Sequence, residues 1–279
     1  MTDLTKLESF DTILQRASER KGSEALVLEM AGDAPSQSLL ANIPDDRYLA
    51  AFTKQIFQSG FVWRVVEQKW SDFEEVFFGF DIEKMLMMPD ELWEKKCQDP
   101  RIIRNATKVM TIKQNAQMIY EIAAEHGSFG KFISEWPSDN IIELWAYLKK
   151  HGARLGGNTG PYALRFLGKD TFLNSQDNEA YFRARGIVEG GINSKKNQKA
   201  MQACFNHWYE KNDYSYKQLS RILSMSVGDN YMGIPSEWTN TNILRLASSA
   251  NWNYWTCWKF WLANVKTFAN PRHNVCKFW

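Results

Sequence analysis

The chain has little that would support a disulfide framework, a membrane span or a β-sheet. Its four cysteines are scattered over 279 residues, unlike the dense, regular spacing of a disulfide-rich domain. No window reaches the roughly 18 consecutive apolar residues of a membrane-spanning helix, and the charged N-terminus has no apolar run of the signal-peptide type. Alternating apolar and polar residues, typical of strands, are nearly absent. These absences favour a reduced, all-α protein, for which we expect a cytoplasmic location.

The chain also lacks a strong charge of either sign. Its formal net charge is +2, with 24% charged and 44% apolar residues. That mixture is usual for a folded globular domain of this length. A nucleic-acid partner would therefore need a local basic patch, since the global charge offers little attraction.

What the sequence does contain is helical periodicity, with apolar residues recurring every three or four positions. We expect a turn-rich segment between Gly22 and Pro44 with only short helical pieces. Capping residues add shorter helices: Ser71 and Asp72 before residues 73–80, Pro89 before residues 90–97, and Ser138 and Asp139 before residues 141–152. The longer periodic segments predict helices at residues 4–20, 45–57, 100–126, 179–185, 197–210 and 215–224.

A change of composition near Gly228 divides the chain into a body, residues 1–228, and a tail, residues 229–279. The tail carries six of the twelve tryptophans, many asparagines and little helical periodicity. Its aromatic residues could pack on the body, stack on bases or bind a protein partner. One hypothesis for function is therefore an interaction protein that acts through this tail.

A glycine-rich turn within residues 148–177 attracts attention because a helix precedes it and another helix follows it. Glycines permit a tight turn that leaves backbone amides outward, a geometry suited to binding a phosphate. Pro161 is expected to be the first helical residue after the turn, and Asp177 follows sixteen positions later. The turn consists of Gly156, Gly157, Asn158, Thr159 and Gly160.

These motifs resemble the helix-hairpin-helix DNA glycosylases, which remove damaged bases from DNA. Leu155, Gly157 and Asp177 fit that superfamily's hairpin and aspartate, with Thr159 in place of a second glycine. Residues 59–81, SGFVWRVVEQKWSDFEEVFFGFD, and residues 102–116, IIRNATKVMTIKQNA, are similar to segments of bacterial 3-methyladenine DNA glycosylase I. The resemblance covers residues 52–177 and is expected to continue to Gly228, so it implies that the body, residues 1–228, is an all-α helix-hairpin-helix glycosylase-like domain.

The resemblance implies a site for hydrolysing the N-glycosidic bond of alkylated purines such as 3-methyladenine in damaged double-stranded DNA. Asp177 would be the catalytic carboxylate, and Arg104 and Lys108 would join the hairpin in binding DNA. Pro161 and Tyr162 stand soon after the hairpin, in the region where bifunctional relatives have a lysine that gives strand cleavage, so we expect a monofunctional enzyme. The residues expected to line the base pocket are Gln55, Phe61, Trp63 and Tyr162.

The chain departs from the methyladenine family in two ways. Family members commonly bind zinc through two Cys and two His, but no Cys or His precedes Phe52, and His273 and Cys276 supply only two ligands. We therefore expect no zinc and no organic cofactor, although hairpin carbonyls could hold a monovalent cation. The second departure is Gln55, which stands where the family has a glutamate. This change supports an alternative, a DNA-binding protein that has lost catalysis.

Each predicted role also has a purely structural alternative. The glycines could form an ordinary turn between helices, and Asp177 could be the N-cap of the next helix. Trp63 could belong to the core. Arg104 and Lys108, one helical turn apart, could be a solvated face, as could the lysines of residues 195–199.

Overall fold

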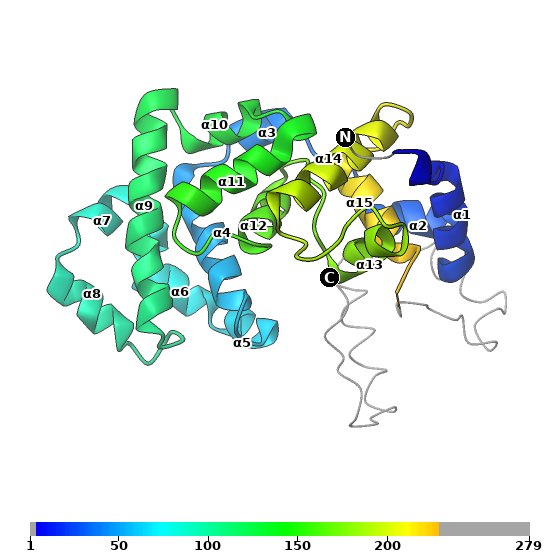
Figure 1. The fold of residues 1–279 in the computed structure, drawn as a ribbon. Coiled ribbons are helices and arrows are strands. Elements are labelled where there is room, and N and C mark those ends of the chain that lie inside the picture. Colours follow the sequence, from blue (N-terminus) through cyan, green and yellow to red (C-terminus); the bar gives the residue numbers. More distant parts are fainter. Residues whose placement is uncertain (1–3, 229–279) are drawn as a thin grey trace, which may run out of the picture.

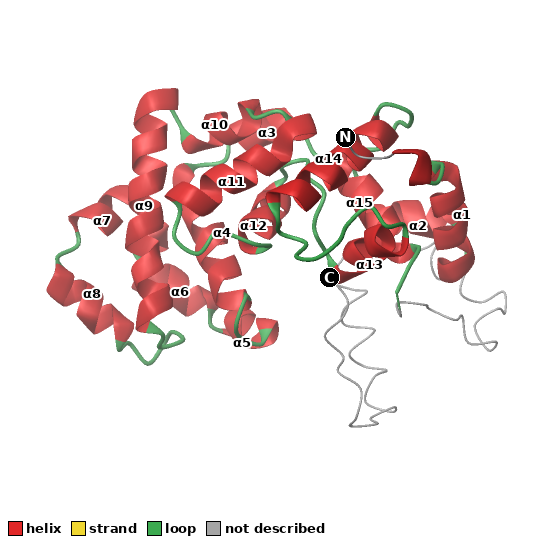
Figure 2. Cartoon of the chain, viewed as in Figure 1, coloured by secondary structure: helices red, strands yellow, loops and turns green. Residues whose placement is uncertain are grey.

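The computed structural model describes residues 4–228, which fold entirely into helices and loops. Figure 2 shows this part of the chain without a strand. The all-α prediction is therefore confirmed. No helix within residues 4–228 has the length and apolar character that a bilayer span requires. The Trp-rich tail of residues 229–279 lies outside the described residues.

The first ten α-helices alternate with short loops and two 3₁₀ turns. They are α1 (Phe10–Lys21), α2 (Glu24–Ala31), α3 (Gln37–Ala41), α4 (Asp45–Gln58), α5 (Trp63–Gln68), α6 (Trp70–Val76), α7 (Ile82–Met87), α8 (Asp90–Cys97), α9 (Ala106–His126) and α10 (Phe129–Glu135), with η1 (Leu4–Lys6) and η2 (Phe78–Phe80). The remaining elements are η3 (Ser138–Asn140), α11 (Ile141–His151), α12 (Thr159–Leu167), α13 (Gln176–Ala184), α14 (Lys195–Tyr209) and α15 (Tyr216–Met225).

The helices form two groups that meet at α11 and α12 (Figure 1). In one group, α9 packs against α4, α7, α8 and α10. In the other, α15 packs against α1, α2, α13 and α14. Helix α12 contacts α4, and α11 contacts both α12 and α14. The glycine-rich turn between α11 and α12 therefore lies where the two groups join.

The second group brings together the beginning and the end of the described chain. Arg16 Nε donates to the Ser226 carbonyl at 3.2 Å, and Arg20 Nε donates to the Met225 carbonyl at 3.2 Å. Trp208 Nε1 donates to the Glu8 carbonyl at 3.1 Å. The N-terminal helices thus complete the fold of the C-terminal helices.

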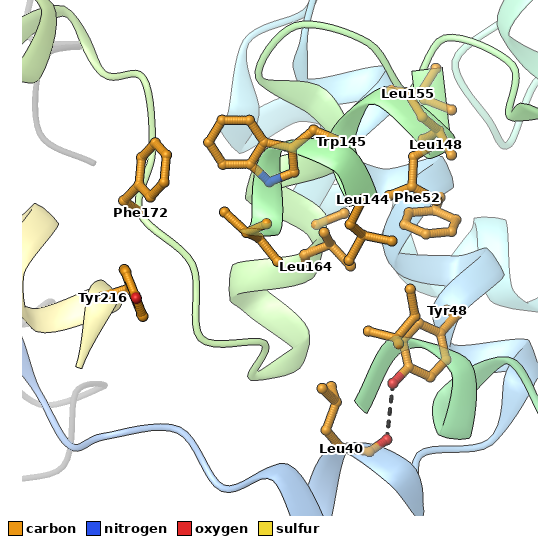
Figure 3. Packing of buried hydrophobic residues seen from close by; sticks show 14 of the residues in the cluster. Leu40, Tyr48, Phe52, Leu144, Trp145, Leu148, Leu155, Leu164, Phe172 and Tyr216 are labelled. Atoms are coloured by element: carbon orange, nitrogen blue, oxygen red, sulfur yellow. Dashed lines mark hydrogen bonds between the residues drawn. The ribbon is translucent and has the colours of Figure 1, made fainter. Parts of the chain in front are cut away.

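A continuous apolar core runs through both groups (Figure 3). Phe172 packs edge-on against Trp145 of α11, with ring centroids 4.8 Å apart, and stacks on Phe205 of α14 at 4.5 Å. Near the α3 end of the core, the Tyr48 hydroxyl donates to the Leu40 carbonyl at 2.9 Å. This satisfies a polar group that would otherwise be buried without a partner.

Local capping explains where helix boundaries differ from the predictions. The expected helix at 100–126 begins at Ala106, because the Asn105 side chain accepts from the Lys108 amide at 3.0 Å. The expected helix at 4–20 is divided by Ser9, which caps α1. Ser71 and Asp72 are not caps but lie inside α6. The segment from Gly22 to Pro44 contains the short helices α2 and α3, as expected.

Candidate functional site

The turn between α11 and α12 requires glycine at two positions. Gly157 has a φ of +63°, a conformation that residues with a Cβ rarely adopt. A Cβ at Gly160 would lie 2.6 Å from the Leu155 carbonyl oxygen. The hairpin therefore owes its shape to its glycines, as the sequence indicated.

The turn uses part of its own hydrogen-bonding capacity. The amide of Thr159 donates to the Gly156 carbonyl at 3.4 Å, and that of Gly160 donates to the Leu155 carbonyl at 3.2 Å. These two amides point into the turn, contrary to the prediction of a fully outward row. Helix α12 also begins at Thr159, so the prediction of Pro161 as its first residue was wrong. Within residues 4–228, the backbone amides of residues 156–158 donate to no backbone carbonyl.

Asn158 was expected to face DNA, but its side chain ties the hairpin to the segment before α13. Its Nδ2 donates to the Asn174 carbonyl at 3.0 Å. Asn174 lies three residues before Asp177. The side chain of Asn158 thus links the hairpin to the segment that leads into α13, the helix that carries Asp177.

Two aromatic side chains from separate elements meet beside the hairpin. Trp63, the first residue of α5, and Tyr162 of α12 lie edge to face, with ring centroids 6.5 Å apart and an interplanar angle of 87°. Both are partly exposed. The side chains predicted for a base pocket at Trp63 and Tyr162 are therefore in contact.

Phe61, two residues before Trp63, contacts Phe57 and Lys108. Its ring stacks on Phe57 at 6.3 Å, and the ammonium of Lys108 lies 4.9 Å from the ring centroid. Phe61 is partly buried and packs against the core.

The two cations predicted to bind DNA occupy different environments. Arg104 is exposed in the loop just before α9. Lys108 is only 6% exposed, and its ammonium donates to the carbonyls of Ile56 at 2.5 Å and Phe57 at 3.3 Å. Burial, with a smaller contribution from Arg154, lowers the pKa of Lys108. The ammonium of Lys108, a residue of α9, therefore lies against the carbonyls at the end of α4 and the ring of Phe61, and not on a solvated face.

Asp177 lies in the first turn of α13, but it is not the N-cap. Ser175 is the N-cap, and its side chain accepts from the Asn178 amide at 3.2 Å. The helix-cap alternative for Asp177 was therefore wrong. The carboxylate packs so closely on Gly228 that a Cβ there would lie 2.3 Å from Asp177 Oδ1.

The charge of Asp177 acts on the pKa of two other side chains, Tyr162 and Lys21. The pKa of Tyr162 is raised mainly by burial, and the charge of Asp177 raises it further. Lys21 of α1 is 1% exposed; burial lowers its pKa, while Asp177 acts in the opposite direction. Tyr162 therefore contacts the ring of Trp63 and also lies within the field of Asp177. Nothing in the sequence around Lys21 indicated that it would lie near this carboxylate.

Gln55 lies in the last turn of α4 and is 7% exposed. Its Nε2 donates to Gln58 Oε1 at 2.7 Å. A cavity of about 450 Å³ lies elsewhere, lined by Pro35, Ser138, Asp139, Asp170, Tyr209 and Tyr216. None of the predicted site residues lines it, so the cavity is not part of the candidate site.

Metal-binding groups are scarce in the part of the chain that the structure describes. Residues 4–228 contain no cluster of three or more His, Cys, Asp or Glu side chains that could hold a metal ion. Cys97 and Cys204 are buried free thiols. His273 and Cys276, the two potential ligands weighed above, lie outside the described residues.

Comparison with known proteins finds similarity over part of the chain. The model of the methyladenine glycosylase family matches residues 42–159. This segment resembles the methyladenine glycosylases. The match ends at Thr159, so it includes Gln55, Trp63 and the approach to the hairpin. Tyr162 and Asp177 come from the part of the chain beyond the family match.

Solved structures of 3-methyladenine DNA glycosylases are similar to about half of this chain. A crystal structure of 3-methyladenine DNA glycosylase I is 21% identical, covers 49% of this chain and 80% of its own, and has a TM-score of 0.39. The Staphylococcus aureus 3-methyladenine DNA glycosylase I, described for its recognition of 3-methyladenine, is 22% identical, with coverages of 48% and 81% and a TM-score of 0.41. The search of curated proteins gave no match.

Proposed function

We propose that this protein is a monofunctional DNA glycosylase that hydrolyses the N-glycosidic bond of alkylated purines, with 3-methyladenine as the expected substrate. The family match over residues 42–159 supports the reaction class. The observation that carries the proposal is the position of Tyr162, which joins the Trp63 ring to the field of Asp177 beside the hairpin. An aromatic wall and a carboxylate in one place are what base excision requires.

Asp177 would act on the sugar. Breaking an N-glycosidic bond develops positive charge on the deoxyribose, as in other oxocarbenium-like reactions. A carboxylate close to that charge stabilises it and can orient the attacking water. An alkylated adenine is already cationic and leaves without strong acid catalysis, so a single carboxylate is sufficient.

Trp63 would hold the base after it leaves the stack. A flipped base needs aromatic or apolar walls. Trp63 is partly exposed and keeps its orientation through the edge contact with Tyr162. A cationic base gains roughly 0.5–2 kcal/mol from an indole face. This attraction favours alkylated purines over neutral, undamaged ones.

The hairpin would bind the DNA backbone. The amides of residues 156–158 can meet a phosphate, and the exposed Arg104 adds positive charge. Hairpin carbonyls remain a proposed site for a monovalent cation. These contacts position the duplex and carry no sequence preference, as expected for an enzyme that searches for lesions.

The monofunctional assignment rests on Pro161 and Tyr162 standing where bifunctional relatives have a lysine. Lys21 is the lysine that could act as a nucleophile instead, because the charge of Asp177 acts on its pKa. Borohydride added to the protein with lesion-containing DNA should trap no covalent complex. A trapped complex that Lys21→Met abolishes would contradict the assignment and identify a lyase.

Gln55 favours a second candidate, a DNA-binding protein without catalysis, because it stands where the methyladenine family has a glutamate. One assay separates the two candidates. Dimethyl-sulfate-treated DNA is incubated with the protein, released bases are separated by chromatography, and binding to the same DNA is measured. We expect release of free 3-methyladenine. Tight binding without release would support the second candidate.

A further inference from the structure

A chain of polar side chains leads from Gln55 to the protein surface. Gln55 Nε2 donates to Gln58 Oε1 at 2.7 Å, and Gln58 Nε2 donates to Glu67 Oε1 at 2.9 Å. The other carboxylate oxygen of Glu67 pairs with Lys54 Nζ at 2.7 Å. The two glutamines are 7% and 6% exposed, whereas the Glu67 side chain is 52% exposed. We call Gln55, Gln58, Glu67 and Lys54 the glutamine relay.

The carboxylate gives the glutamine relay a direction. The two ends of a glutamine amide have nearly the same shape, so their placement has to be argued from their partners. An ionised carboxylate only accepts hydrogen bonds. Gln58 must therefore turn its NH₂ to Glu67 and its Oε1 to Gln55. Gln55 must then turn its own NH₂ to Gln58.

This arrangement leaves Gln55 Oε1 available to a ligand. Within residues 4–228 no donor is bonded to this oxygen, yet it is not among the buried side-chain atoms left without a partner. The oxygen therefore keeps some contact with solvent. Gln55 thus presents an acceptor, and the NH₂ group that could have presented a donor is held by Gln58.

We propose that Glu67 is a positioning residue that acts through Gln58 to keep Gln55 Oε1 directed at the flipped base. This inference rests on the proposed function and adds a substrate preference to it. Adenine carries an exocyclic amino group that donates, whereas guanine carries a carbonyl at the equivalent place that accepts. Gln55 Oε1 would therefore favour 3-methyladenine over 3-methylguanine. Neither Gln58 nor Glu67 needs to touch the base.

The test is the ratio of kcat/KM for 3-methyladenine to that for 3-methylguanine, measured in the same methylated DNA. Glu67→Gln replaces an obligatory acceptor with a side chain that can accept or donate. Both orientations of Gln55 then become accessible. We expect the ratio to fall by about fivefold, the scale of one hydrogen bond.

Two further variants separate the glutamine relay from a general loss of structure. Gln58→Glu with Glu67→Gln keeps the composition and charge of the wild type and moves the acceptor next to Gln55. It should restore the wild-type ratio. Lys54→Glu with Glu67→Lys keeps the ion pair but places a donor beside Gln58. This variant should lower the ratio below that of Glu67→Gln, because Gln55 would then present its NH₂.

A wild-type ratio in Glu67→Gln, or no recovery in the exchanged double variant when both fold normally, would overturn the proposal. A second measurement works even for an inactive protein. In glutamine-labelled protein, a scalar coupling across the hydrogen bond should connect Gln55 Nε2 to the Gln58 side-chain carbonyl and should weaken in Glu67→Gln. Absence of the coupling refutes the glutamine relay, whereas a normal coupling without base release refutes only the proposed function.

Discussion

Asn115 holds the backbone of Ala153 with both ends of its side-chain amide. Its Oδ1 accepts from the Ala153 amide at 2.8 Å, and its Nδ2 donates to the Ala153 carbonyl at 3.2 Å. Asn115 is fully buried in α9, and Ala153 opens the turn that leads into the hairpin. This pair explains why an asparagine in α9 accompanies a hairpin almost forty residues later in the sequence.

Asn115→Ala should therefore damage the hairpin and the DNA affinity together. The change leaves a backbone donor and acceptor of Ala153 without a partner, at a cost of about 1–3 kcal/mol in unfolding free energy. Urea unfolding and titration with a fluorescent duplex measure the two effects. Gln117→Ala is the matched control, because Gln117 lies on the exposed side of α9 and bonds only to Glu121 at 2.7 Å. Equal affinity in Asn115→Ala and the control would refute the role of the pair.

Arg104 and Lys108, one turn apart in sequence, should respond differently to substitution. Arg104→Ala removes an exposed cation, so the slope of log affinity against log salt should become shallower by about 1. Lys108→Met should leave that slope unchanged and reduce stability, because the carbonyls of Ile56 and Phe57 lose their donor. Duplex binding at several salt concentrations decides the matter. A shallower slope in Lys108→Met would show that Lys108 contacts DNA and would contradict its structural role.

Trp63→Ala should affect activity far more than folding. Because the indole is partly exposed, the unfolding free energy should change by less than about 1 kcal/mol. Loss of stacking should lower kcat/KM for 3-methyladenine release by about tenfold. Trp136→Ala provides a contrast, since Trp136 packs on Phe132 and Tyr147 and has no ring contact with Trp63 or Tyr162 within the described residues. It should reduce stability and leave release unchanged; the reverse pattern would place Trp63 in the core.

Lys169 provides a test of the fold through pH. Burial lowers the pKa of this 1% exposed lysine to about 8, against about 10.4 for an unfolded lysine. Between these values the unfolded chain binds more protons, so the contribution of Lys169 to stability rises with pH. From about pH 8 to pH 10 the wild type should gain about 1 kcal/mol relative to Lys169→Met. Parallel stability curves for the two proteins would contradict the buried position.

Capping and periodicity explain which parts of the fold the sequence revealed. The strong apolar period of α4 and α14 gave helices whose bounds agree within two residues. The start of α9 was predicted too early, because periodicity alone does not show that the Asn105 side chain ends the preceding loop. Likewise, Asp177 and Ser175 are both good N-cap residues, and in the structure it is Ser175 whose side chain accepts from the Asn178 amide.

The candidate site was only partly predictable, because its residues come from distant segments. Family resemblance indicated Trp63 and Tyr162, which do meet. It could not indicate Lys21, whose proximity to Asp177 depends on α1 packing against the C-terminal helices. Nor could it show that Lys108 is buried, because a lysine at such a position on an amphipathic helix can point to solvent or lie against the end of a neighbouring helix.

The central claim is that Asp177 stabilises the transition state of base release, and Asp177→Asn tests it most directly. The substitution keeps the shape and removes the charge. Glu179→Gln is the control, because Glu179 lies in the same first turn of α13 and pairs with Arg183. Single-turnover release of 3-methyladenine should fall at least about 100-fold in Asp177→Asn, with DNA affinity preserved, and stay unchanged in Glu179→Gln. Wild-type release by Asp177→Asn would contradict the account.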